Sequence, residues 1–118
     1  MTASCPAEYI AIAETLADAA RPIAQHYFRA GIPIEAKADD SPVTKADREI
    51  ETALREILAD TCPGHGVVGE EMGGVPDGDG PLWVLDPIDG TKAFVTGMPV
   101  FGTLIALAIE SRFVLGVI

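Results

Sequence analysis

The segment with the clearest chemical potential is Asp86-Pro87-Ile88-Asp89-Gly90-Thr91. Two carboxylates flank a proline after an apolar run, and the tight turn that glycine permits could aim both of them and the Ile88 carbonyl at one point. Hard oxygen ligands of this kind suit Mg²⁺ or Ca²⁺. Free amides at the start of the following turn could bind phosphate. A polar turn with a capping aspartate accounts for the same residues equally well, so both interpretations stay open.

Two further segments carry carboxylates in suggestive positions. Gly69-Glu70-Glu71 follows two valines, and because neighbouring side chains on a strand face opposite ways, we expect one glutamate to face a site. Thr44 and Asp47 have the three-residue spacing of a capping box at a helix start. Asp47 is therefore a candidate either for capping alone or for catalysis.

The elements that must position these residues follow from hydrophobic periodicity. Apolar side chains at three- and four-residue steps predict a helix over residues 8–30, capped by Gly31 and interrupted by Pro22, which should cost a hydrogen bond or kink it. A polar connector over residues 33–43 leads to a second helix from Thr44 to Asp60.

The second half of the chain reads mainly as strands. A short strand opens at Val67, a buried strand covers residues 81–86, and residues 100–109 and 112–118 form a hairpin. A glycine- and aspartate-rich loop occupies residues 72–80, residues 90–97 form a short helix or turn, and His65 is expected to be only a turn residue. The fold class is therefore α+β, with two N-terminal helices packed on a mainly antiparallel sheet.

Composition excludes several classes of function. The 118 residues carry 8 Lys and Arg against 18 Asp and Glu, a formal net charge of −10, which argues against binding to nucleic acid or anionic membranes by charge. Two cysteines outside any C-x-x-C pair support neither a disulfide framework nor a zinc site. With no signal peptide visible, a cytoplasmic location is expected.

Taken together, three segments resemble the inositol monophosphatase superfamily of lithium-sensitive, magnesium-dependent phosphatases. They are Ser41-Pro42-Val43-Thr44-Lys45-Ala46-Asp47, Gly69-Glu70-Glu71 and Trp83-Val84-Leu85-Asp86-Pro87-Ile88-Asp89-Gly90-Thr91. Their order and spacing make the resemblance specific, and it covers essentially the whole chain. It implies the first part of the layered αβαβα sugar-phosphatase-type fold.

Finer details resemble the histidinol-phosphatase branch of this superfamily. These are Lys45-Ala46-Asp47-Arg48, Pro63-Gly64-His65-Gly66 and Gly90-Thr91-Lys92-Ala93-Phe94. The resemblance implies hydrolysis of a small phosphate ester by metal-activated water, with histidinol phosphate, a compound of histidine biosynthesis, as the favoured substrate. Inositol monophosphate or another small ester is the alternative within the family.

The resemblance also implies a role for each matching position. Glu70, Asp86 and the Ile88 carbonyl would hold the first Mg²⁺, and Asp86 and Asp89 the second, of two or three in a complete site. Gly90 and Thr91 would hold the phosphate through their amides. Asp47 and Thr91 would orient and help deprotonate the attacking water, whereas Glu71 is not expected to be a direct ligand.

The length departs from the family pattern. The family takes a further metal-binding aspartate and much of the substrate pocket from a second part of a longer chain. Residues 1–118 are therefore expected to be an N-terminal metal- and phosphate-binding domain that stops inside a core strand at 113–118 and lacks its C-terminal domain. Alone it should be nearly inactive, and the complete protein should be a homodimer. A non-catalytic metal- or phosphate-binding module is the alternative from another functional class.

Overall fold

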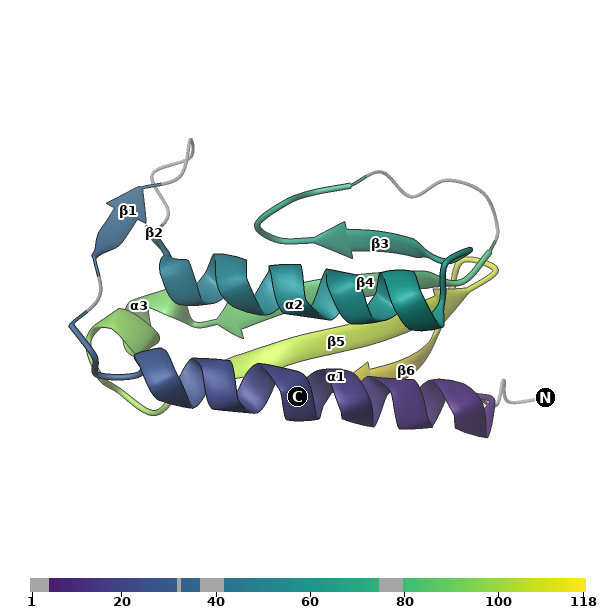
Figure 1. Ribbon diagram of the computed structural model, residues 1–118, viewed down its shortest axis with the longest axis horizontal. Coiled ribbons are helices and arrows are strands. Elements are labelled where there is room, and N and C mark those ends of the chain that lie inside the picture. The colour runs from purple at the N-terminus through teal and green to yellow at the C-terminus, as the bar shows by residue number, and fades with distance from the viewer. Residues whose placement is uncertain (1–4, 32, 37–41, 75–79) are drawn as a thin grey trace.

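Two helices lie side by side on one face of a four-stranded sheet (Figure 1). The computed structural model describes residues 5–31, 33–36, 42–74 and 80–118. The helices are α1 (Ala7–Tyr27) and α2 (Lys45–Thr61), and the sheet has the order β3 (Gly66–Gly69), β4 (Leu82–Asp89), β5 (Gly102–Ile109), β6 (Arg112–Val117). Strand β3 is parallel to β4, and the two other pairs are antiparallel. This confirms the α+β class with a mainly antiparallel sheet.

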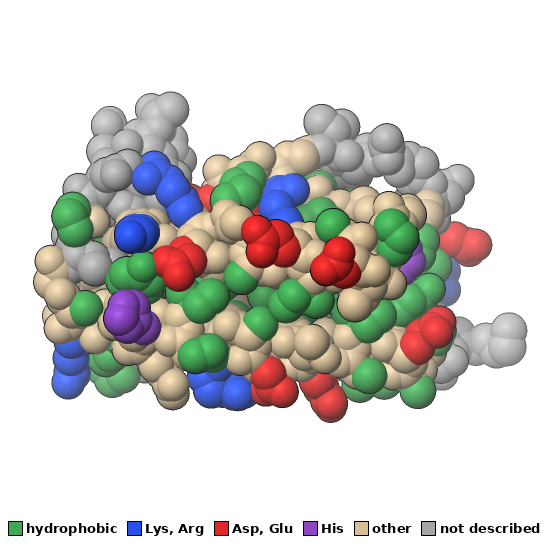
Figure 2. Space-filling view, viewed as in Figure 1, with side chains coloured by type: hydrophobic (Ala, Val, Ile, Leu, Met, Phe, Trp, Pro, Cys, Tyr) green, Lys and Arg blue, Asp and Glu red, His purple; other side chains and the backbone are tan. Residues whose placement is uncertain are grey.

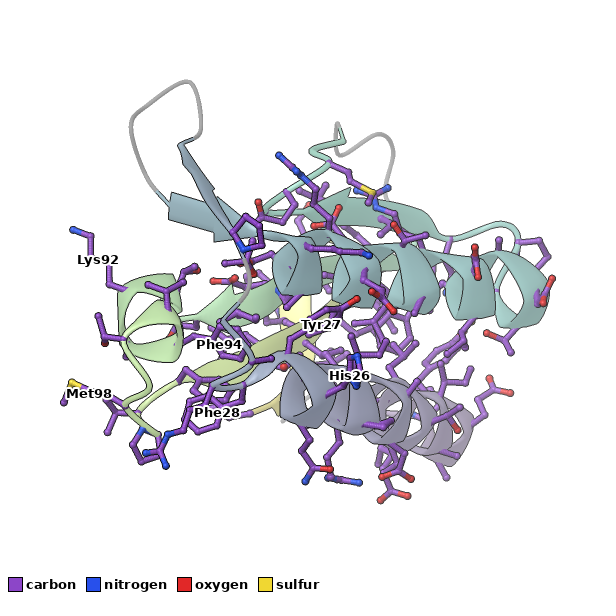
Figure 3. The ribbon with its side chains drawn as sticks, turned by 60° about the vertical axis from the view of Figure 1, so that its left-hand side comes forward. His26, Tyr27, Phe28, Lys92, Phe94 and Met98 are labelled. Carbon is purple, nitrogen blue, oxygen red and sulfur yellow. The ribbon has the colours of Figure 1, made fainter. Side chains whose placement is uncertain are left out.

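Helix α1 ends earlier than its periodicity predicts. Its last residue is Tyr27, so the expected cap at Gly31 is wrong. Phe28 turns into an extended conformation, and its ring packs against Phe94 and Phe101 with centroids 5.7 and 5.2 Å away. Figure 3 shows Phe28 near Phe94, which belongs to the short helix α3 (Thr91–Val95). Packing of this aromatic cluster therefore overrides continuation of the helix.

The other expected interruption of α1 has a smaller effect. The helix continues through Pro22. Proline has no N–H to donate to the carbonyl four residues earlier, so the helix loses one backbone hydrogen bond there without ending.

A two-stranded hairpin lies within the region expected to be a polar connector. Strands β1 (Ile34–Ala36) and β2 (Pro42–Thr44) pair in antiparallel fashion, with Ile34 opposite Thr44. Each strand has three residues, which is too short for an alternating pattern to be recognised. The polar residues 37–41 of the connector lie outside the described residues.

Helix α2 begins where β2 ends, as the sequence predicts. Thr44 is its N-cap, and the capping box with Asp47 is present. The helix buries Ala46, Asp47, Ile50, Glu51, Leu54 and Leu58. That face packs against β4 and α1, so α2 lies between the sheet and the other helix.

Tyr27 connects the end of α1 to α2. Its hydroxyl donates to Glu49 Oε2 at 2.5 Å. This hydrogen bond, followed by burial and by the negative charge of Glu49, raises the pKa of Tyr27 above its ordinary value of 10.0. The phenol therefore stays protonated at neutral pH and remains a donor.

The C-terminal hairpin forms as expected, and its second strand lies at the edge of the described sheet. Glu110 and Ser111 join β5 to β6 with φ of 51° and 62°, the left-handed pair of a two-residue hairpin turn. Strand β6 is the edge of the described sheet: Phe113 is 69% exposed, whereas Val114, Leu115 and Val117 pack against the core. The expectation that residues 113–118 form a core strand of a longer protein stays a prediction.

The exposed faces of the two helices are acidic. In Figure 2 acidic side chains lie along the outer surfaces of α1 and α2, and hydrophobic side chains fill the seam between them. No helix in the described part of the chain is long and apolar enough to cross a membrane.

His65 has a structural role that the turn expectation missed. Trp83 on β4 is fully buried, and its indole N–H donates to His65 Nδ1 at 3.1 Å. The ring of Tyr9 meets the imidazole edge-on, 5.4 Å away. A buried indole N–H needs an acceptor, and His65 supplies it.

Replacing His65 by Phe keeps a ring at this position but removes the acceptor. We expect the free energy of unfolding to fall by about 1–3 kcal/mol, because the buried indole N–H is left without a partner. Urea unfolding followed by the fluorescence of Trp83, the single tryptophan, measures this change. The exposed His26 provides the control, since H26F should change stability by less than about 0.5 kcal/mol. Equal stabilities of H65F and H26F would contradict the role of His65.

Candidate functional site

The parallel pairing of β3 and β4 brings two of the candidate segments together. In this register Gly69 lies opposite Leu85, and the N–H of Glu70 donates to the Leu85 carbonyl at 2.9 Å. Glu70 and Asp86 therefore lie beside one another at the same edge of the sheet. Strand β3 ends at Gly69, so Glu70 and Glu71 occupy the following turn, and the expectation of alternating faces does not apply to them.

A bulge in β4 separates Asp86 from Asp89. Asp86 lies opposite Leu104 and Asp89 opposite Gly102, so β4 has one residue more than β5 over this stretch. A bulge changes the direction of the side chains after it. Asp86 is half-buried and Asp89 is exposed. Because Pro87 has no N–H to contribute to a strand ladder, it is compatible with this irregular position.

Asp47 is fully buried and uses its two carboxylate oxygens differently. Oδ2 accepts from the N–H and the hydroxyl of Thr44, at 2.9 and 2.6 Å. Oδ1 lies 3.2 Å from the hydroxyl oxygen of Thr91, which donates to it. Asp47 therefore caps α2 and also contacts the start of α3, so capping leaves one carboxylate oxygen for a second contact, and its catalytic role stays a prediction.

The hydroxyl of Thr91 connects the helix cap to the bulge. Besides Asp47 Oδ1, it lies 3.1 Å from the Ile88 carbonyl oxygen. A hydroxyl has one proton to donate, so it is shared between these two acceptors. Thr91 is half-buried whereas Asp47 is fully buried, so Thr91 is the partner in this contact that reaches solvent.

Gly90 gives the chain the turn that connects β4 to α3. It is the N-cap of α3 and has a left-handed conformation, with φ of 89°. A Cβ at this position would lie 3.1 Å from the Val100 carbonyl oxygen. Both the conformation and the close approach of the next loop require glycine here.

The carboxylates of the site do not form a closed cluster. Within the residues that the structure describes, no group of three or more His, Cys, Asp or Glu side chains could hold a metal ion. Glu70 and Asp89 are both exposed. The donors available are carboxylate and carbonyl oxygens, which fit Mg²⁺ or Ca²⁺ and not a thiolate-binding metal. The metal roles of Glu70, Asp86, Ile88 and Asp89 stay predictions.

Glu51 belongs to this region, although the sequence reasoning missed it. It is fully buried on α2, and its Oε1 and Oε2 accept from the N–H groups of Glu71 and Met72, at 2.8 and 2.9 Å. A signal was available in the sequence. Glu51 lies four residues after Asp47 and three before Leu54, which places all three on one face of the helix.

An apolar cavity lies elsewhere on the molecule. It encloses about 450 Å³ between α1 and strands β5 and β6, and its lining includes Ala20, Phe28 and Ile105. None of the candidate site residues lines it. Its lining is mainly apolar and also includes Arg21, Gln25 and Thr103.

The contact between Asp47 and Thr91 can be tested by a double-mutant cycle. T91V should lower the free energy of unfolding by about 1 kcal/mol through loss of a hydrogen bond, and D47N by about 1 kcal/mol through the weakened cap. Because the residues touch, the double variant should differ from the sum of the single effects by about 0.5 kcal/mol or more. Urea unfolding measures all four proteins. Strict additivity would show that the contact contributes nothing.

Comparison with known proteins agrees with the fold. The model of the family described as "Inositol monophosphatase family" matches residues 6–118. The bifunctional phosphatase IMPL2 of Arabidopsis thaliana is 46% identical over 112 residues, 93% of this chain and 32% of that protein. The histidinol-phosphatase of Chlorobaculum parvum is 42% identical over 108 residues, 91% of this chain and 42% of that protein.

A solved structure supports the same relationship. An inositol monophosphatase from Zymomonas mobilis is 51% identical, with a TM-score of 0.77, over 97% of this chain and 44% of that one. The chain thus spans less than half the length of each of these three relatives. With a family model matched over nearly all of its residues, the chain belongs to the inositol monophosphatase family, a family of phosphatases.

Proposed function

We propose that this chain supplies the metal- and phosphate-binding part of a Mg²⁺-dependent phosphomonoesterase that hydrolyses histidinol phosphate. The observation that carries the proposal is the meeting of Glu70 and Asp86 at one sheet edge, next to the hydrogen-bonded pair Asp47 and Thr91, in a member of a phosphatase family. Each of the three segments singled out in the sequence contributes to this arrangement.

In this proposal the oxygen donors divide between two cations. Glu70, Asp86 and the Ile88 carbonyl would hold one Mg²⁺, and Asp86 and Asp89 a second. When bound, these cations supply positive charge that stabilises the phosphoryl group and activates water. The three carboxylates carry three negative charges against four positive charges on two Mg²⁺, so the sign of the local charge would be inverted by the metal. Without metal, the site would repel a phosphate ester.

Asp47 and Thr91 would handle the proton of the attacking water. The buried carboxylate of Asp47 accepts from the Thr91 hydroxyl, which leaves the lone pairs of that hydroxyl available to orient water from the surface side. The attacking water would pass its proton to the Thr91 hydroxyl oxygen while that hydroxyl gives its own proton to Asp47, so Asp47 would act as a general base through Thr91. The backbone amides of Gly90 and Thr91 would bind the phosphate.

The choice of substrate rests on the relatives and on short motifs. The Chlorobaculum parvum relative is named a histidinol-phosphatase. Inositol monophosphate is the second candidate, because the Zymomonas mobilis relative, at 51% identity, is described as an inositol monophosphatase. We further propose a cytoplasmic, lithium-sensitive homodimer for the complete enzyme, with neither nucleic acid nor membrane as a partner.

Removal of a shared ligand tests the metal site directly. D86N replaces a donor proposed for both cations, so Mg²⁺ affinity measured by calorimetry on the 118-residue chain should fall by more than about tenfold. The control D60N changes an exposed aspartate near the end of α2 and should leave the affinity unchanged. Equal affinities of D86N and D60N would contradict the proposed ligand set.

Turnover can be tested in a chimera, because we propose that the 118 residues alone are nearly inactive. The chain replaces the aligned part of the Chlorobaculum parvum enzyme. This chimera should hydrolyse histidinol phosphate when Mg²⁺ is present, and D47N should lower its kcat by about 100-fold or more while Mg²⁺ affinity stays nearly constant. Metal binding without any turnover would favour the non-catalytic module.

A second chimera separates the two substrates. In this chimera the 118 residues are followed by the part of the Zymomonas mobilis protein that the chain does not cover, in place of the corresponding part of the Chlorobaculum parvum enzyme. A kcat/KM preference for histidinol phosphate in both chimeras supports a contribution of this chain to that choice. A preference that follows the remainder would contradict the substrate assignment and leave the phosphatase proposal intact.

A further inference from the structure

Glu51 is a buried carboxylate that the proposed chemistry does not use. Its side chain has no exposed surface, although it lies near the middle of α2. Burial of a charged group is costly unless donors surround it. Three donors do so here: Arg55 Nε at 3.0 Å and the N–H groups of Glu71 and Met72, at 2.8 and 2.9 Å. Two of these donors are backbone groups of the turn that follows β3.

That turn is closed on itself and is also held by Arg55. Gly69 and Gly73 exchange two backbone hydrogen bonds, at 3.0 and 2.9 Å. Arg55 Nη2 donates to the Gly73 carbonyl at 2.5 Å. Glu51 and Arg55 together therefore bind two N–H groups and one carbonyl of a five-residue loop. The exposed side chain of Glu70 projects from this loop.

Gly69 provides the space for the carboxylate. A Cβ at this position would overlap the Cδ and both oxygens of Glu51. On the other side, the N–H of Glu70 is bound to the Leu85 carbonyl, immediately before Asp86. The backbone of Glu70 is thus held between β4 and the buried carboxylate of α2.

We propose that Glu51 is a positioning residue for the metal site: it fixes the Glu70 loop against α2 so that Glu70 and Asp86 can bind one divalent cation. This inference rests on the proposed function, because it assumes that Glu70 is a ligand. Asp47 and Glu51 lie one helical turn apart; Asp47 contacts the start of α3, and Glu51 contacts the loop after β3. One face of α2 therefore contacts both of the segments that follow β4 and β3.

Two variants disturb the Glu51 carboxylate in different ways: E51Q replaces it by an amide, and G69A displaces it. E51Q keeps the length of the side chain but leaves one acceptor oxygen for three donors. G69A leaves Glu51 in place but puts a methyl group where its carboxylate lies, and the flexible end of the side chain can move away. The matched control is E56Q, which removes the charge of an exposed glutamate on the same helix.

Mg²⁺ titration by calorimetry on the 118-residue chain gives the main measurement, with circular dichroism as the test of folding. We expect E51Q and G69A to bind Mg²⁺ about 10–100-fold more weakly than the parent chain, the range found for residues that orient metal ligands. E56Q should equal the parent. Amide hydrogen exchange at Glu71 and Met72 should accelerate in both variants and not in the control, because E51Q leaves one acceptor oxygen for three donors and G69A displaces the carboxylate.

The Mg²⁺ affinities and the folding of the variants separate the role of Glu51 from the proposed metal site. Folded variants with parental Mg²⁺ affinity would overturn the role of Glu51 and leave the proposed function standing. Failure of the parent chain to bind Mg²⁺, or parental affinity in E70Q, would remove the proposed metal site and this inference with it. If both variants lost their fold, the inference would also be overturned, since Glu51 would then serve general stability.

Discussion

Helix α2 buries two carboxylates on the face that packs against the sheet, and both must be supplied with hydrogen-bond donors. A buried charge without partners would cost more than a small domain can tolerate. Asp47 obtains its donors from its own N-cap and from Thr91, and Glu51 obtains them from Arg55 and the loop after β3. The positions of the two loops around the site follow from this requirement.

The main elements could be predicted from the sequence because each has a strong local signal. The apolar stripe of α2, its capping residue Thr44 and the hairpin of β5 and β6 all depend on residues close together in the chain. Features that depend on distant contacts could not be predicted. The end of α1 is set by the packing of Phe28 against Phe94 and Phe101, and the exposure of β6 is set by its place at the sheet edge.

The candidate site divides in the same way. The run from Asp86 to Thr91 was recognisable because carboxylates, proline and glycine follow one another within six residues. The contact of Asp47 with Thr91 spans 44 positions, and that of Glu51 with Glu71 spans 20, so neither shows in local spacing. The position of Glu51 on the same helix face as Leu54 is a local signal of burial. Its hydrogen-bond partners are a property of the tertiary structure, because they lie in the loop after β3.

The overlap between Glu51 and a side chain at position 69 also has a consequence for evolution. Gly69 has an ordinary backbone conformation, so glycine is required there by a side chain from another element and not by the turn itself. The two positions form one steric unit. A lineage that replaced the glutamate by a smaller residue would be free to gain a side chain at position 69, whereas in the reverse order the Glu51 carboxylate would first have to leave its buried position. We therefore expect these two positions to change together in related sequences, because of the packing between α2 and β3.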